Sequence, residues 1–273
     1  MQKRMYQINN YAIQLDVNHL LPHYQSVHPF YDRFLPHLVK YLPDNTLVID
    51  VGANVGDTLV SMLGNNDKLD YLCIEASTDF FSDLKINVES LKAQNNKVSI
   101  SIVNEFVGRD ITDVGLDGKG GTKHAVVGGG NIKSKTMSSI LSDLAVEHSR
   151  VSILKTDVDG FDWDVIRSSY DVLGHNPYLY FECEYSNFKQ LESYKELFSE
   201  MVTIGYSKFA FFDNFGQFIL STDDLNVVGA LLDYVKRQNF HKSTRTCYYY
   251  DVLAYHNDKS VEVDAIITEY NIR

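Results

Sequence analysis

Residues that could do chemistry are concentrated in two segments, the first of which runs from Thr46 to Thr58. There a β-branched apolar stretch ends at Asp50, and a turn with two glycines, Gly52 and Gly56, precedes an expected helix. This layout is typical of a ligand pocket at the carboxyl end of a parallel strand. Asp50 would repel a pyrophosphate and attract a cationic ligand, and the glycine spacing differs from G-x-G-x-x-G. The chemistry therefore favours S-adenosylmethionine (SAM) over NAD.

The second apolar stretch ends at Glu75, which follows Gly56 by about 20 residues, the interval at which an acid reaches ribose hydroxyls in such folds. A carboxylate can accept from both hydroxyls of a ribose diol. Standing alone, Glu75 would be explained as a solvated acid at a strand end, but beside Asp50 and the glycines the ribose interpretation is favoured. At the end of the third stretch, Asn104 or Glu105 could meet the adenine amino group, and a turn explains both equally well.

The second chemical segment lies at the end of the fourth apolar stretch. Alternation along a strand puts Lys155, Asp157 and Asp159 on one side. Both faces of a parallel sheet are normally buried, so three charged side chains there are expected to face a ligand crevice. Asp162 and Asp164 fall in the first turn of the next expected helix, where the helix dipole favours acids. That explanation suffices for Asp164 and competes with a site role for Asp162.

One strand later, Glu182 and Glu184 share a face at the strand tip, near Asp157 and Asp159 of the preceding strand. Four carboxylates converging in a crevice could hold a hard divalent cation through oxygen ligands. They could equally repel one another until the pKa of one rises, which would produce a general base. Of these two, the metal is the less favoured interpretation.

Together the two segments resemble the FkbM-type family of SAM-dependent methyltransferases over roughly residues 46–185. The first family motif appears as Val48-Ile-Asp-Val-Gly-Ala-Asn-Val-Gly56. The second, which typically reads K-I-D-V-E-G-x-E, appears here as Lys-Thr-Asp-Val-Asp-Gly-Phe-Asp162. Thr156 therefore stands at the isoleucine, and Asp159 and Asp162 replace the two glutamates. The family's acid after the fifth strand looks like Glu182.

The resemblance implies an α/β fold, a Rossmann-like, seven-stranded class I methyltransferase sheet, with SAM lying over the tips of its first strands. It implies that the first motif surrounds the methionine end of SAM, that Glu75 holds the ribose and that Asp157 faces the transfer site. The expected cofactor-binding residues are Asp50, Gly52, Asn54, Gly56, Glu75, Ala76, Asn104 and Asp157.

The resemblance also implies O-methylation of a hydroxyl on a sugar, glycan or natural product. The expected catalytic residues are Asp157, as base or orienting group, with Asp159 and Glu182 supporting it. His256, at the end of the last apolar stretch, is a further candidate base, although a lone histidine in an aromatic run is more often structural. Two alternatives stay open: a catalytically silent SAM-binding or scaffold protein, and a less favoured NAD(P)-dependent oxidoreductase.

Seven apolar, β-rich stretches are expected to position these residues. The spacers between the first five are long enough for crossover helices, which predicts parallel strands. The sixth stretch contains Asp213-Asn-Phe-Gly216, a turn signal, and is either a bent strand or a hairpin. We therefore expect a mostly parallel sheet with antiparallel strands near the C-terminus. The stretches are 46–51, 71–75, 98–107, 151–156, 178–183, 206–220 and 248–256.

Two regions lie outside this core. Residues 1–45 form an N-terminal extension with an extended segment, Tyr6–Val17, and an amphipathic stretch, Phe30–Leu42, which packs on the sheet edge or forms part of a lid. The methyltransferase domain would then span 46–273. It carries a Gly-rich insert at about 108–135, in which Gly-Gly-Gly-Asn131 is read as a mobile loop rather than a phosphate cradle.

Composition limits the partners. A net charge of −11 argues against nucleic acid, because neutralising phosphates needs clustered Lys and Arg. Three widely spaced cysteines predict buried reduced thiols and a cytoplasmic location. No apolar run reaches the roughly 20 residues of a membrane span, and no signal peptide is indicated. The expected partner is a small-molecule or glycan acceptor, and the oligomeric state stays open.

Overall fold

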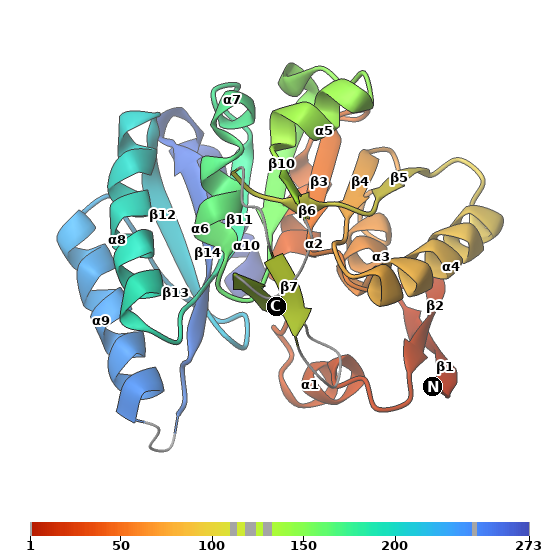
Figure 1. The fold of residues 1–273 in the computed structure, drawn as a ribbon, viewed down its shortest axis with the longest axis horizontal. Helices are drawn as coiled ribbons and strands as arrows, with labels where there is room; N and C mark the ends of the chain where they lie inside the picture. Colours follow the sequence, from red (N-terminus) through yellow and green to blue (C-terminus); the bar gives the residue numbers. More distant parts are fainter. Residues whose placement is uncertain (1, 110–113, 118–123, 128–132, 242–244, 273) are drawn as a thin grey trace.

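The computed structural model describes residues 2–109, 114–117, 124–127, 133–241 and 245–272. Its centre is an eight-stranded mixed sheet with the order β13-β12-β14-β11-β10-β3-β4-β5 (Figure 1). These strands are β3 (Leu47–Val51), β4 (Asp70–Ile74), β5 (Ser99–Val103), β10 (Val151–Thr156), β11 (Tyr178–Glu184), β12 (Tyr206–Asp213), β13 (Phe218–Thr222) and β14 (Tyr249–His256). The main helices are α2 (Phe34–Leu38), α3 (Asp57–Leu63), α4 (Thr78–Gln94), α5 (Met137–Asp143), α6 (Asp162–Arg167), α7 (Tyr170–Leu173), α8 (Phe188–Thr203), α9 (Leu225–His241) and α10 (Ser260–Asn271).

The five strands predicted to be parallel are parallel: β4 and β10 flank β3, β5 pairs with β4, and β11 pairs with β10. The chain first moves from β3 outward to β4 and β5, and then returns to place β10 on the other side of β3. The strand order therefore reverses between β3 and β10. In open α/β sheets, ligands bind outside the carboxyl ends of the strands at such a switch point.

The sheet has eight strands rather than the expected seven, because the stretch 206–220 is a hairpin and not a bent strand. The Asp213 carboxylate accepts from the backbone N–H groups of Phe215 and Gln217, both at 2.9 Å, and Gly216 adopts a positive φ of 77°. This turn divides the stretch into β12 and β13. The expected late antiparallel strand is β14, which lies between β11 and β12 and runs antiparallel to both.

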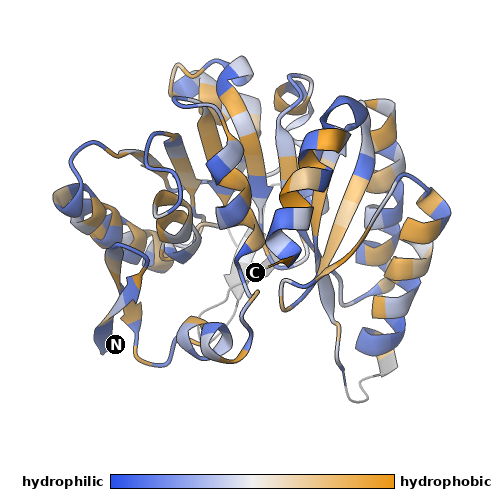
Figure 2. Ribbon diagram, turned by 180° about the vertical axis from the view of Figure 1, so that it is seen from behind, coloured by the Kyte–Doolittle hydropathy of each residue, from blue (hydrophilic) through white to orange (hydrophobic). Residues whose placement is uncertain are grey.

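Two apolar cores cover the two faces of the sheet, as alternate residues along each strand require. Val48 and Ile153 pack with α2, α3, α4 and α10, whereas Ile49 and Leu154 pack with α5, α6, α7, α8 and α9. Apolar residues accordingly run along the strands and on one side of the helices (Figure 2). Asp50 and Lys155 follow two residues after Val48 and Ile153, so both point to the α2/α3 face.

The N-terminal extension is a hairpin followed by short helices, where the sequence predicted one extended segment and one amphipathic stretch. Strands β1 (Lys3–Ile8) and β2 (Tyr11–Asp16) pair antiparallel and contact α4, where Gln14 N–H donates to Asn87 Oδ1 at 2.8 Å. Helix α1 (Leu21–Val27) follows, and the amphipathic stretch becomes α2 and the 3-10 turn η1 (Val39–Tyr41). The division at residue 46 stays a prediction.

The remaining short elements lie mostly in the insert. Gly-Gly-Gly-Asn131 lies outside the described residues, so its predicted loop is not described. Around it are β6 (Phe106–Val107), β7 (Val114–Asp117), β8 (His124–Val127) and β9 (Ser134–Lys135), and two 3-10 turns lie elsewhere, η2 (His148–Arg150) and η3 (Asn257–Lys259). Across the described ranges, none of the helices has the length and apolar character that crossing a bilayer demands.

Candidate active site

The turn after β3 lies at the switch point and is held against the neighbouring strands by its backbone. Gly52 N–H donates to Ile74 O at 2.9 Å, and Asp157 N–H donates to Val51 O at 3.1 Å. Gly52 has a φ of 76°, and a Cβ placed there would lie 1.9 Å from the Asp157 carbonyl oxygen. Only glycine fits, because the turn after β10 passes directly over this position. The two motifs of the sequence are therefore in contact.

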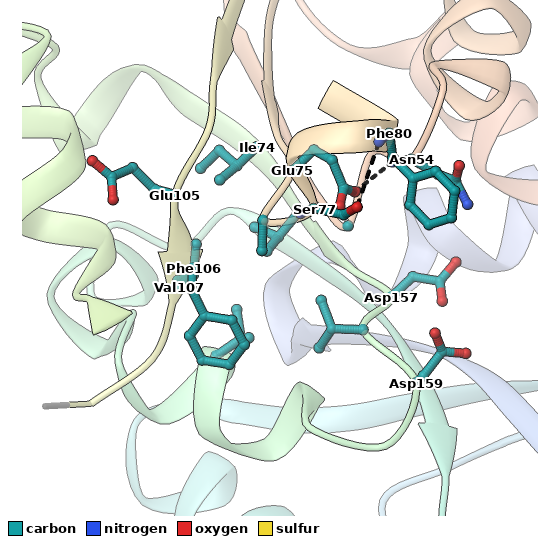
Figure 3. Close-up of a pocket in the computed structure, with 15 residues that line it drawn as sticks. Asn54, Ile74, Glu75, Ser77, Phe80, Glu105, Phe106, Val107, Asp157 and Asp159 are labelled. Carbon is teal, nitrogen blue, oxygen red and sulfur yellow. Dashed lines mark hydrogen bonds between the residues drawn. The ribbon is translucent and has the colours of Figure 1, made fainter. Parts of the chain in front are cut away.

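A cavity opens beside this turn, which we call the inner cavity (Figure 3). Glu75, Ala76 and Ser77 contribute one wall from the end of β4. Figure 3 shows the carboxylates of Asp157 and Asp159 pointing to the same side of the cavity, away from Glu105. Most of the remaining lining is apolar. The full set of lining residues is Val51, Gly52, Asn54, Ile74, Glu75, Ala76, Ser77, Phe80, Glu105, Phe106, Val107, Asp157, Val158, Asp159 and Val165.

Glu75 is buried at the end of β4 and clamps two loops. Its Oε2 accepts from Asn54 N–H and its Oε1 from Ser77 N–H, both at 2.8 Å (Figure 3). Burial raises the pKa of Glu75, and these two N–H groups oppose the rise. Each carboxylate oxygen has a second lone pair. Glu75 can therefore still accept hydrogen bonds from a diol in the inner cavity.

Asn104 fastens the same loop from the neighbouring strand. Its Nδ2 donates to Glu75 O at 2.7 Å and to Ala76 O at 3.2 Å. Of the two residues proposed to meet adenine, Glu105 is the one that lines the inner cavity. Glu105 also lies 2.7 Å from Lys135 Nζ, a contact across the insert. An adenine role for either residue stays a prediction.

Asp50 lies beneath the turn in a buried ion pair, in surroundings the sequence did not predict. Lys155 Nζ is 2.8 Å from Asp50 Oδ1 and 3.5 Å from Asp157 Oδ2. Desolvation acts to lower the pKa of Lys155, but the charges of Asp50 and Asp157 raise it, so the ammonium is retained. Burial raises the pKa of Asp50, and Lys155 opposes that rise. Lys155 thus already balances the charge of Asp50, and the carboxylates at the cavity itself are those of later residues.

The turn after β10 is built on Asp162, the first residue of α6. The Asp162 carboxylate accepts from Thr156 Oγ1 at 2.9 Å and from Val158 N–H at 3.3 Å, and it is completely buried. Burial, and then the charge of Asp157, raises its pKa to about 8. Asp162 therefore positions the loop that carries Asp157 and Asp159. Asp164 accepts from Arg109 N–H at 3.1 Å, also outside the cavities.

A second opening, the outer cleft, adjoins the inner cavity and has a volume of about 440 Å³. Four residues line both: Gly52, Asn54, Asp157 and Asp159. Tyr31 and Asp32 of the N-terminal extension form part of its wall. The other lining residues are His19, Leu20, Leu21, Tyr24, Asp57, Thr58, Glu182, Glu184, Asn214, Phe215, Arg245, Tyr248, Tyr249 and Asp251.

Three of these residues, Asp159, Glu182 and Glu184, form a carboxylate cluster. Each offers one oxygen that lies within 4.8 Å of the others. Burial raises the pKa of Asp159 to about 7, with the charges of Asp157 and Glu184 adding to it, and raises that of Glu182 well above its ordinary range. The predicted convergence is confirmed for these three side chains, whereas the fourth acid, Asp157, lines the outer cleft without belonging to the cluster. Oxygen ligands in this number could share protons or hold a hard cation.

Two acids that the sequence did not single out complete the site. Asp251 of β14 is the direct cross-strand partner of Glu182, and Asp32 contributes from the N-terminal extension. Burial raises the pKa of Asp32 to about 7 and that of Asp251 well above its ordinary range. Asp251 stands in an aromatic run only five residues before His256, so the only available signal was an acid in an apolar strand.

His256 as a candidate base was wrong. Because β14 runs antiparallel, its first residues meet the carboxyl end of β11, and its last residue lies at the opposite edge of the sheet. His256 pairs with Tyr206 at the start of β12, and their rings lie 4.5 Å apart. His256 is therefore a structural residue, as a lone histidine in an aromatic run more often is.

Comparison with known proteins bears on this arrangement. The family model described as the methyltransferase FkbM domain matches residues 50–211. None of the curated proteins matches the chain in sequence. Among solved structures, methyltransferase FkbM from Methylobacillus flagellatus KT is 12% identical with a TM-score of 0.48, covering 86% of this chain and 59% of that one.

Two further solved structures are similar at a comparable level. Precorrin-6y C5,15-methyltransferase from Geobacter metallireducens GS-15 is 11% identical with a TM-score of 0.43, covering 82% of this chain and 87% of that one. The plantazolicin methyltransferase BpumL, in complex with SAH, is 9% identical with a TM-score of 0.42, covering 87% of this chain and 89% of that one.

Replacing Gly52 by alanine tests the contact between the two motifs. We expect Gly52→Ala to lower the free energy of unfolding by about 1–3 kcal/mol, because the new Cβ would displace the Asp157 carbonyl and the φ is unfavourable. Gly229→Ala is the matched control: Gly229 lies in α9, and beyond the local backbone of that helix no atom lies within 4 Å of an added Cβ, so this variant should stabilise the helix. Urea denaturation measures both, and equal effects would contradict the contact.

The carboxylate cluster predicts that stability falls as pH rises. The pKa of Asp159 rises from an ordinary 3.8 to about 7 in the folded protein. Its contribution to the free energy of unfolding is therefore fully present below about pH 4 and is lost as the pH rises through 7. Asp159→Asn should therefore raise the melting temperature at pH 8 by about 2–4 °C, for about 1 kcal/mol, and change it less at pH 5.

Thermal unfolding with EDTA at both pH values measures this difference. Asp44→Asn, which removes an acid at an exposed ion pair with Lys68, is the control and should show no such dependence. A lower melting temperature for Asp159→Asn at pH 8 would contradict the repulsion described for the cluster.

Proposed function

The chain belongs to the FkbM methyltransferase family, and we propose that it transfers a methyl group from SAM to a hydroxyl of a small-molecule or glycan acceptor. The observation that supports this most directly is the junction of two cavities. A smaller, mainly apolar cavity with a buried acid adjoins a larger, polar cleft, and Asp157 lines both. Such a pair suits a cofactor on one side and an exchangeable acceptor on the other.

The inner cavity fits the chemical groups of SAM. The remaining lone pairs of Glu75 suit the ribose diol, and Ile74, Phe80 and Val107 offer apolar contacts for a base. Gly52 and Asn54 lie where this cavity meets the outer cleft, next to Asp157, and would contact the methionine end. Asp50 would act from beneath the turn by fixing Lys155. When bound, SAM supplies a methyl group on a positively charged sulfur.

Asp157 is proposed as the base or orienting group for the acceptor hydroxyl. Its carboxylate is half exposed, and Lys155 Nζ lies 3.5 Å from its Oδ2, which fixes the side chain at the junction. In this position Asp157 would accept the hydroxyl proton as the new oxygen–carbon bond forms. Asp159 and Glu182 would support it by exchanging that proton with the outer cleft. Alignment of the reacting groups would supply much of the remaining acceleration.

The cellular location stays a prediction, and so does the choice between an enzyme and a catalytically silent protein. The three cysteines are free and buried, in keeping with the reduced thiols from which a cytoplasmic location was predicted. A catalytically silent SAM-binding protein would use the same inner cavity and must be separated by experiment. An NAD(P)-dependent oxidoreductase is disfavoured by the family and by the glycine spacing.

Calorimetry and methyl transfer test the proposal together. We expect SAM and S-adenosylhomocysteine to bind and NAD not to bind, and we expect labelled methyl to pass from SAM to hydroxylated acceptors in a panel of glycans and small molecules. Binding of NAD in place of SAM would contradict the cofactor. SAM binding without transfer to any acceptor would favour the silent protein.

Asp157→Asn tests the catalytic assignment. We expect turnover to fall by roughly 10²–10⁴-fold, because the base would be lost, while the affinity for S-adenosylhomocysteine stays within a few-fold. Asp44→Asn is the control for the loss of a carboxylate. Transfer at the wild-type rate by Asp157→Asn would disprove the assignment.

A further inference from the structure

We propose that the acceptor carries an ammonium group beside its hydroxyls, as an amino sugar or amino alcohol does, and that the acids of the outer cleft bind this charge. The inference rests on the proposed function, since it takes the outer cleft as the acceptor half of the site. It concerns what the cleft selects, and it excludes acidic acceptors such as uronic acids and phosphorylated sugars.

The first argument is the charge of the cleft. Among the described residues that line it, seven carry carboxylates and Arg245 is the one with a permanent positive charge. Lys155 lies nearby but is engaged with Asp50 and Asp157. SAM would add a sulfonium and an ammonium against one carboxylate. Burial raises the pKa of four of the acids, Asp32, Asp159, Glu182 and Asp251, so these bind protons while the cleft lacks a cation and ionise when one binds. A cationic acceptor would complement these acids, whereas a neutral or acidic one would not.

The second argument is an enclosed oxygen with no partner. Glu182 Oε2 is inaccessible to solvent and has no hydrogen-bond partner among the described residues, although Glu182 lines the cleft. Its direct cross-strand partner is another acid, Asp251, and like charges in that relation are destabilising. A buried carboxylate left unpaired is unfavourable. An ammonium group in the cleft beside this carboxylate would offset the repulsion.

The third argument is the aromatic wall of the cleft. Tyr24 and Tyr31 come from the N-terminal extension and stack with ring centroids 5.1 Å apart. Phe215 comes from the β12–β13 turn and stacks on His28 with one face, Tyr248 directly precedes β14, and Tyr249 is its first residue. Aromatic faces attract cations. The Arg245 guanidinium already lies 5.0 Å from the Tyr248 ring centroid, so one ring of this wall holds a cation within the protein.

An ammonium group accounts for more of this lining than a metal ion would. A divalent cation would engage the carboxylate cluster of Asp159, Glu182 and Glu184, but it would give no role to the aromatic wall. The three-acid ligand set also leaves out Asp32 and Asp251, although Asp251 lies directly beside Glu182. An organic cation with hydroxyls can contact acids and rings together, so we favour it.

Matched pairs of probes test the proposal by calorimetry on the full chain, with and without S-adenosylhomocysteine and with EDTA present. Choline is compared with its neutral isostere 3,3-dimethylbutan-1-ol, and glucosamine with N-acetylglucosamine. We expect at least one ammonium probe to bind and to do so at least tenfold more tightly than its neutral counterpart. The preference should weaken as salt rises.

Substitutions of the acids in the outer cleft show whether the preference for ammonium probes arises there. The double variant Glu182→Gln/Glu184→Gln should remove the preference. Asp251→Asn, on a different strand, should reduce it and keeps the proposal testable should the double variant fail to fold. Asp44→Asn should keep it. Equal binding of charged and neutral probes, no binding of either ammonium probe, or a preference that survives both cleft variants would overturn the proposal. Failure of the proposed cofactor would show separately, as no binding of S-adenosylhomocysteine.

Discussion

The buried ion pair between Lys155 and Asp50 is the interaction on which the rest of the site depends. The two residues are register partners on β10 and β3, the strands between which the sheet order reverses. Removing both charges from water costs free energy. We therefore interpret the pair as fixing the arrangement of the strand ends rather than as a source of stability. Here Lys155 also reaches Asp157, so one ammonium ties the strand tips to the residue at the junction of the two cavities.

This pair leaves the other acids without a balancing cation. Asp159, in the turn after β10, Glu182 of β11 and Asp251 of β14 lie at the same edge of the sheet, because these three strands are neighbours in it, and burial raises the pKa of each acid. The apolar cores on both faces of the sheet stabilise the fold against this cost. Buried acids without a balancing cation are typical of ligand-binding sites. A ligand of opposite charge then contributes to stability as well as to recognition.

The sequence predicts those parts of the site that depend on local pattern and on parallel strands. The turn after β3, the acid at Glu75 and the convergence of Asp159 with Glu182 follow from strand ends meeting at one edge. What could not be predicted depends on long-range pairing. Asp251 reaches the site only because β14 inserts antiparallel beside β11, and the same reversal carries His256 to the far edge. An acid such as Asp32 gives no signal until its segment is placed.

Two of the three departures from the family motif in the second segment compensate one another. Thr156 stands where isoleucine is typical, and Asp162 stands where the longer glutamate is typical. In the structure Thr156 Oγ1 donates to Asp162 Oδ1 at 2.9 Å, in a completely buried contact. A shorter acid at 162 would otherwise be left with fewer donors, and a hydroxyl at 156 would lack an acceptor. Each substitution supplies the partner that the other needs, so the loop carrying Asp157 is held although its consensus side chains are absent.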